Sequence, residues 1–145
     1  MGFFLTLFYK MLDSLKNTFL TRFTKMTYAT DADLYAVPYL EFRRANNGDR
    51  HRLLLCDMPL EIEYQDNEYC VVANGWIVSE HMPGRYDVLN DRPCRDYRIW
   101  PEDYLVFHYK DYVLVRDSDI SLIEFVDKAE PVRRMAYTEQ AIDLL

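Results

Sequence analysis

Apolar residues recur every three or four positions along the first 26 residues of the chain. This spacing places them on one side of an α-helix and leaves polar residues on the other side. No Gly or Pro interrupts the stretch from Phe3 to Met26. The pattern predicts a long amphipathic helix over residues 1–26, whose apolar stripe contacts the body of the protein, a partner or a second copy. The residues expected to make this contact are Phe4, Phe8, Leu12, Leu15, Phe19 and Phe23.

The same segment fits a transmembrane helix or a secretory signal poorly. Lys10 and Asp13 interrupt its apolar run well before the roughly 20 residues that span a bilayer. Its four basic residues against one acidic residue leave binding to a membrane surface as an alternative. Gly2 and Thr6 also match a short myristoylation pattern. Met26 is a candidate internal start, and residues 1–25 would then be dispensable for the fold.

Beyond this segment the apolar residues fall into short runs. Leu60, Ile62 and Tyr64 alternate with Glu61 and Glu63, as expected of a half-buried strand. Similar runs, separated by turn residues, predict about seven or eight short strands. The chain is therefore expected to be an α+β protein: the long N-terminal amphipathic helix, then a small antiparallel β barrel or sandwich within residues 27–145.

Several polar segments are expected to reverse the chain between strands. Asn74–Gly75 separates two apolar runs, and this dipeptide favours the type I′ turn of a β-hairpin. Turns are also predicted at Ala45–Arg50, Pro83–Gly84 and Lys110–Asp111. The apolar run at Ile120–Val126 fits a strand or a helix, and a short tail or helix is expected over Thr138–Leu145.

Residues 82–109 combine a Pro-Gly-x-Tyr turn, a polar loop, a second strand and a Pro-x-x-Tyr motif. The positions concerned are Pro83, Gly84, Tyr86, Val88, Tyr97, Ile99, Pro101, Tyr104 and Tyr109. In this order the segment resembles a small β module of phage and prophage accessory proteins of unknown function. Arg85 stands where that module usually has an acidic residue. The resemblance implies a phage-encoded accessory protein and no particular activity.

The charge of the chain is unevenly distributed. The net charge is −7, and residues 26–145 alone hold 23 acidic and 13 basic residues, a difference of −10. This acidic body argues against direct nucleic-acid binding, which requires a basic surface. It fits a basic protein partner, or a nucleic-acid-mimicking inhibitor of a DNA- or RNA-binding host protein. The candidate acidic patch consists of Glu61, Glu63, Asp66 and Glu68.

Patterns that indicate catalysis or cofactor binding are missing from the sequence. Its four glycines are too dispersed for a phosphate-binding loop, and its histidines and cysteines lack the spacing of metal ligands. Cys94 lies between Arg92 and Arg95, which would lower its pKa, but Asp91 and Asp96 offset them. We therefore predict no catalytic residue, no metal and no cofactor. The odd number of cysteines suits a reducing compartment, and hence the cytoplasm.

The sequence thus predicts a non-enzymatic protein that acts through protein–protein interaction in an accessory or regulatory role. On the body of the chain, Tyr97, Trp100 and Tyr104 are expected to carry the binding, because aromatic side chains contribute large contact areas. The alternatives are the acidic inhibitor, and a peripheral membrane protein bound through residues 1–26.

Overall fold

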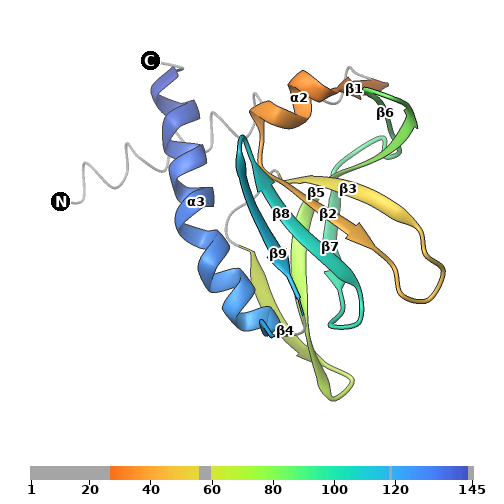
Figure 1. Ribbon diagram of the computed structural model, residues 1–145, viewed down its shortest axis with the longest axis vertical. Coiled ribbons are helices and arrows are strands. Elements are labelled where there is room, and N and C mark those ends of the chain that lie inside the picture. The colour runs from red at the N-terminus through yellow and green to blue at the C-terminus, as the bar shows by residue number, and fades with distance from the viewer. Residues whose placement is uncertain (1–26, 56–59, 118, 144–145) are drawn as a thin grey trace.

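The computed structural model describes residues 27–55, 60–117 and 119–143. In this part of the chain an antiparallel sheet carries a long helix on one side and a short helix at one end (Figure 1). The strands are β1 (Tyr28–Thr30), β2 (Tyr39–Arg43), β3 (Arg50–Leu55), β4 (Glu61–Gln65), β5 (Glu68–Met82), β6 (Arg85–Val88), β7 (Cys94–Ile99), β8 (Tyr104–Tyr109) and β9 (Tyr112–Arg116). The helices are α2 (Asp31–Ala36) and α3 (Leu122–Asp143).

Strand β5 organises the sheet, whose order is β1-β6-β5-β3-β2-β8-β9. It is 15 residues long and pairs with four other strands. Its first half pairs with β4 and β7, and its second half pairs with β3 and β6. Every one of these pairings is antiparallel, and their register shifts at Ala73–Gly75 and at Glu80–Met82 of β5. Elsewhere the extended backbone places successive side chains on opposite faces of the sheet.

The predicted hairpin turn at Asn74–Gly75 is wrong, because β5 runs through both residues. Gly75 lies so close to β3 that a Cβ atom there would overlap the carbonyl oxygen of Leu54. The glycine is therefore needed for the close approach of two strands rather than for a turn. The tight turn lies between β4 and β5 instead, where Asp66 and Asn67 have φ angles of 54° and 67°. Positive φ at two central residues is the signature of a type I′ turn.

The other three predicted turns are confirmed, and the one at Ala45–Arg50 connects β2 to β3, which pair with each other. Gly84 has a φ of 79° between β5 and β6, and Lys110 has a φ of 52° between β8 and β9. Both turns join strands that pair with each other. At these positions the turn residues of the sequence predicted correctly which strands are neighbours in the sheet.

The expected architecture, an N-terminal helix joined to a small barrel or sandwich, is wrong. The described chain is mostly antiparallel sheet, and its long helix is C-terminal. The strands form one sheet with separate ends at β1 and β9 rather than a closed barrel. The predicted helix over residues 1–26 and its six contact residues lie outside the described residues.

Helix α3 includes Leu122–Val126 and Thr138–Asp143, the helical and described parts of two segments that the sequence separated, Ile120–Val126 and Thr138–Leu145. Pro131 lies between them and lacks the N–H that would bond to the carbonyl of Asp127. Both residues are exposed, so water can bond to that carbonyl. The opposite side of α3 packs on the sheet through Leu122, Phe125, Val126, Ala129 and Ala136. Burial of this side maintains the helix across the proline.

The main core lies between α3 and one face of the sheet. It contains alternate residues of the central strands, among them Leu40, Phe42, Leu53, Leu105 and Phe107. Each of these five side chains is buried. The residues between them therefore lie on the other side of the sheet, away from α3. In β2 these are Tyr39, Glu41 and Arg43, and in β3 they are Arg50, Arg52 and Leu54.

Helix α2 covers one part of that other side. Leu34 packs there with Leu54, Trp76 and Val78. A capping box begins the helix: the backbone N–H of Thr30 donates to Asp33 at 2.9 Å, and the Thr30 hydroxyl accepts from the Asp33 N–H. A six-residue helix covers little area, and among the described residues Val113 and Val115 at the far side of this face stay exposed.

Candidate functional site

The uncovered part of the sheet spans β2, β8 and β9. We call it the open face and define it by Glu41, Tyr104, His108, Val113 and Val115. The register places Glu41, Val106 and Val115 in one row, and His108 and Val113 in the next. Tyr104, Val113 and Val115 are 43%, 52% and 42% exposed, respectively. The open face therefore presents apolar side chains on neighbouring strands to solvent.

An ion pair crosses the middle of the open face. His108 Nε2 lies 2.8 Å from Glu41 Oε1, and the His108 ring stacks on Tyr39 with 4.5 Å between ring centroids. The hydrogen bond with His108 holds the pKa of the Glu41 carboxyl below its usual value, against the effect of its partial burial. The hydrogen bond thus links two polar side chains from neighbouring rows of the open face.

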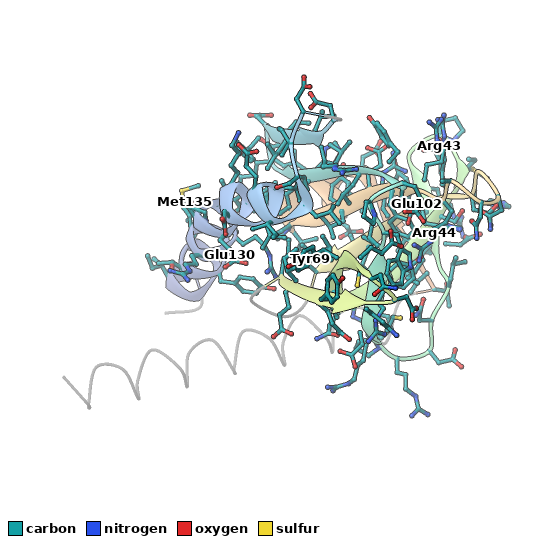
Figure 2. All side chains as sticks on the ribbon, turned by 90° about the horizontal axis from the view of Figure 1, so that it is seen from below. Arg43, Arg44, Tyr69, Glu102, Glu130 and Met135 are labelled. Atoms are coloured by element: carbon teal, nitrogen blue, oxygen red, sulfur yellow. The ribbon has the colours of Figure 1, made fainter. Side chains whose placement is uncertain are left out.

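At one end of the open face, a cleft of about 690 Å³ opens between the β2–β3 hairpin, the turn before β8 and the end of β9. We call it the arginine cleft. Figure 2 shows Arg43, Arg44 and Glu102 gathered at this end of the molecule, away from Glu130 and Met135 of α3. The charged residues of its lining are Arg43, Arg44, Arg50, Arg116, Glu102, Asp103 and Asp117.

Asp103 anchors the floor of the arginine cleft. This side chain is only 6% exposed, and it accepts from Arg44 Nη1 at 2.7 Å, from the Ala45 N–H at 3.0 Å and from the Trp100 N–H at 3.1 Å. The Arg44 guanidinium also lies over the Tyr97 ring, 4.6 Å from its centroid. The β2–β3 hairpin is thereby tied to the turn between β7 and β8.

Arg116 is held on the opposite wall. Its guanidinium donates to the backbone carbonyls of Pro101 and Ile120. Arg44 and Arg116 thus have defined partners that keep them in place. They support the walls of the cleft rather than offering unpaired charge.

Arg43 and Arg50 differ from Arg44 and Arg116 in their lack of an ionic or hydrogen-bond partner of this kind among the described residues. The register of β2 and β3 places them directly opposite each other. Neither makes an ion pair with any residue that the structure describes; Arg43 lies over the Tyr104 ring, 5.5 Å from its centroid. Together with Tyr104 they line both the arginine cleft and an adjoining pocket of about 290 Å³. Two like charges are thus concentrated at one edge of the open face.

The structure brings the three predicted aromatic residues to this region. Tyr104 lies on the open face and lines the arginine cleft. Trp100 is half-buried and lines a neighbouring pocket with Arg44 and Asp103. Tyr97 is half-buried beneath Arg44, and burial raises its pKa despite that cation. Their part in binding stays a prediction, and Tyr104 offers the most exposed surface.

Sequence reasoning missed Arg43, Arg50, Val113 and Val115. A signal for the arginines was present, because Arg43 lies shortly before the predicted turn over Ala45–Arg50 and Arg50 is its last residue. A hairpin around that turn places residues near its two ends in opposite positions. The exposure of Val113 and Val115 could not be predicted from the sequence, because valine side chains in strands are more often buried.

The acidic patch lies on the β4–β5 hairpin. Glu61 and Glu63 are exposed on β4, Asp66 is in the turn, and Glu68 begins β5. Arg98 of β7 reaches Glu63 with its Nη2 atom at 3.1 Å from Oε1. Part of the negative charge of the patch is therefore neutralised within the fold.

Cys70 and Cys94, the two cysteines that the structure describes, show no sign of an activated thiolate. Cys70 is fully buried and Cys94 is half-buried. Burial raises the pKa of both thiols, and Asp96 raises that of Cys94 further. The arginines beside Cys94 therefore do not lower its pKa, contrary to the chemistry that the sequence allowed for. Among the described residues, no three His, Cys, Asp or Glu side chains are placed to hold a metal ion.

Comparison with known proteins gives the chain no match. No family model, curated protein or solved structure matches it. The resemblance to a phage β module therefore stays a prediction. Within the part of the chain that the structure describes, no helix is long and apolar enough to cross a membrane.

Proposed function

We propose that this protein is a non-enzymatic binding protein that acts in an accessory role in the cytoplasm, through its open face. The observation that carries this proposal is the exposure of Val113, Val115 and Tyr104 on neighbouring strands of one sheet. Exposed apolar residues that are contiguous and bordered by charge are typical of protein-binding surfaces. Arg43 provides charge at the border, and the Glu41–His108 pair provides polar groups within the surface.

The edge of the sheet at β9 supports the same function. Among the described residues β9 pairs with β8 alone, so its other edge has unpaired backbone groups. An extended segment of a partner can add to such an edge through main-chain hydrogen bonds. Its alternate side chains would then continue the rows that contain Val113 and Val115. This arrangement predicts a partner that binds in an extended conformation.

Position-dependent photo-crosslinking in the native host tests this proposal. A photoreactive amino acid at position 115 is compared with one at position 123. Ile123 is the matched control, because it is 44% exposed on α3 while Val115 is 42% exposed on the open face. We expect a discrete, protease-sensitive adduct from position 115 and none from position 123. Equal labelling from the two positions, or none from position 115, would contradict the proposal.

A second candidate is the acidic inhibitor of a nucleic-acid-binding protein. It is favoured by Glu61, Asp66 and Glu68, which have no basic partner among the described residues, although Arg98 pairs with Glu63. Neutralising all four carboxylates to amides should then abolish a salt-sensitive complex with a basic protein. The same substitutions leave the open face intact, so the two candidates are separable.

A further inference from the structure

We propose that Arg43 and Arg50 form an anion site that binds a phosphate group at the edge of the arginine cleft. This site would take phosphate whether or not the open face binds a protein. The two residues are register partners on β2 and β3, and each lines both the cleft and the adjoining pocket.

The electrostatic argument begins with the pairing itself. Like charges that are directly opposite on antiparallel strands destabilise the sheet. The row next to them shows the ordinary solution, because Glu41 is directly opposite Arg52 there. No described acid forms an ion pair with Arg43 or Arg50, although Arg50 is close enough to Glu41 to help lower the pKa of that carboxyl. An anion placed between two guanidinium groups would remove this repulsion.

The carboxylates near the site already have other roles, or lie to one side. Glu41 is bound to His108, and Asp103 is bound to Arg44 and two backbone N–H groups. Asp117 accepts from the N–H of Asp119, and Glu102 is an exposed residue of the cleft lining with no ion pair among the described residues. None of these acids forms an ion pair with Arg43 or Arg50.

The chemistry of the two arginines favours phosphate over a single carboxylate. A guanidinium group binds oxyanions through paired N–H donors, and two such groups match the several oxygens and the charge of a phosphate. The ring of Tyr104 lies against Arg43 and limits its movement, since the guanidinium carbon is 5.5 Å from the ring centroid. The adjoining pocket of about 290 Å³ has room for a phosphate and the atoms next to it.

Thermal denaturation with and without inorganic phosphate, at constant ionic strength, tests the site. Wild-type protein is compared with Arg43→Gln, Arg50→Gln and the control Arg95→Gln, an exposed arginine of β7. We expect phosphate to raise the Tm of the wild type and of R95Q in a saturable manner. We expect R43Q and R50Q to weaken phosphate affinity by about tenfold or more, because each loses a charged donor pair.

The two variants should also be more stable than the wild type in the absence of phosphate, by roughly 1–4 °C in Tm, because the repulsion is removed. Stabilisation together with lost affinity distinguishes a binding site from a purely structural pair. The proposal is overturned if phosphate raises Tm no more than chloride does, if all variants respond equally, or if both variants are less stable than R95Q.

Further titrations identify the form in which the phosphate arrives. A phosphoserine peptide that binds more tightly than inorganic phosphate would support a phosphorylated side chain, and weaker binding would support the free ion. The matching unphosphorylated peptide serves as the control. Tighter binding of the dicarboxylate glutarate than of phosphate would overturn the assigned ligand class.

Discussion

Gly75 of β5 and Leu54 of β3 approach each other so closely that the glycine Cα faces the leucine carbonyl oxygen with no room for a Cβ atom. Replacing Gly75 with alanine should therefore force β3 and β5 apart at the centre of the sheet. We expect Gly75→Ala to lower the free energy of unfolding by about 3 kcal/mol, the upper range for overpacking. Urea denaturation measures this change.

Gly48→Ala is the control for that experiment. Gly48 has a φ of 74° but no neighbouring atom within 4 Å of an added Cβ. Its replacement should cost about 1 kcal/mol through backbone strain alone. Equal losses for the two variants would show that the contact with Leu54 is less restrictive than described.

Asp103 should be essential to the shape of the arginine cleft. Asp103→Ala removes three hydrogen bonds, one of them from the Arg44 guanidinium. We expect a loss of about 3 kcal/mol in unfolding free energy, because a mostly buried charge pair is broken. The neighbouring Glu102→Ala should change stability by less than about 0.5 kcal/mol, since its side chain is exposed. A small loss for Asp103→Ala would contradict its anchoring role.

Glu130 of α3 connects the helix to β4 and to a buried arginine. Its Oε1 atom accepts from the Leu60 N–H at 3.0 Å and lies 3.6 Å from Nη1 of Arg133, whose side chain is 0% exposed. Glu130→Ala should lower the free energy of unfolding by about 3 kcal/mol, because burying Arg133 without this carboxylate is unfavourable. Chemical denaturation measures the loss.

Glu124 on the same helix provides the comparison. It pairs with Lys128, and both side chains are 50% exposed. An exposed i,i+4 pair contributes about 0.5 kcal/mol or less, so Glu124→Ala should be nearly neutral. If the two variants lost similar stability, the burial of Arg133 would not explain the effect of Glu130.

The Glu41–His108 pair should make stability depend on pH in the acidic range. The pKa of Glu41 is lower in the folded protein than the usual carboxyl value of about 4.3, so the unfolded chain takes up the proton first as pH falls. Glu41 therefore stabilises the folded protein at pH values above about 4.3, and this stabilisation is lost as the pH falls below that value. Glu41→Gln should therefore be less stable at neutral pH and lose less stability on acidification.

Unfolding free energies measured from pH 7 to pH 3 check this dependence. Glu61→Gln is a suitable control, because Glu61 is exposed and has no ion pair among the described residues. Parallel pH profiles for Glu41→Gln and the wild type would rule out the stabilising role of the pair.

The sequence predicted the strands best where alternation and turn chemistry agreed. The β8–β9 hairpin follows directly from its apolar runs and from Lys110–Asp111. The turn predicted at Asn74–Gly75 was wrong because the dipeptide carries no information about neighbouring strands. The glycine is needed there because the carbonyl oxygen of Leu54 on β3 leaves no room for a Cβ atom. The run at Ile120–Val126 fitted a strand or a helix, and the burial of Phe125 and Ala136 on the sheet is what makes it part of one long helix.

The candidate site was predicted only in part. Tyr104 could be chosen because large aromatic side chains favour interfaces. Arg43 and Arg50 could not be chosen from the sequence, because only the β2–β3 register shows that they lie opposite each other and that neither lies opposite an acid. Val113 and Val115 are exposed because α2 is too short to reach them. Both features arise from tertiary structure, which residue patterns along the chain do not contain.

The position of β2 between β3 and β8 has a consequence for the order of folding. Tyr39 at its start pairs with His108, so one edge of β2 stays open until the β8 segment has been synthesised. During that interval the growing chain exposes the apolar side of a partial sheet, together with an unpaired strand. Such pairing between distant segments slows folding and exposes intermediates to aggregation. Synthesis of this protein should therefore benefit from a chaperone that shields β2 until β8 arrives.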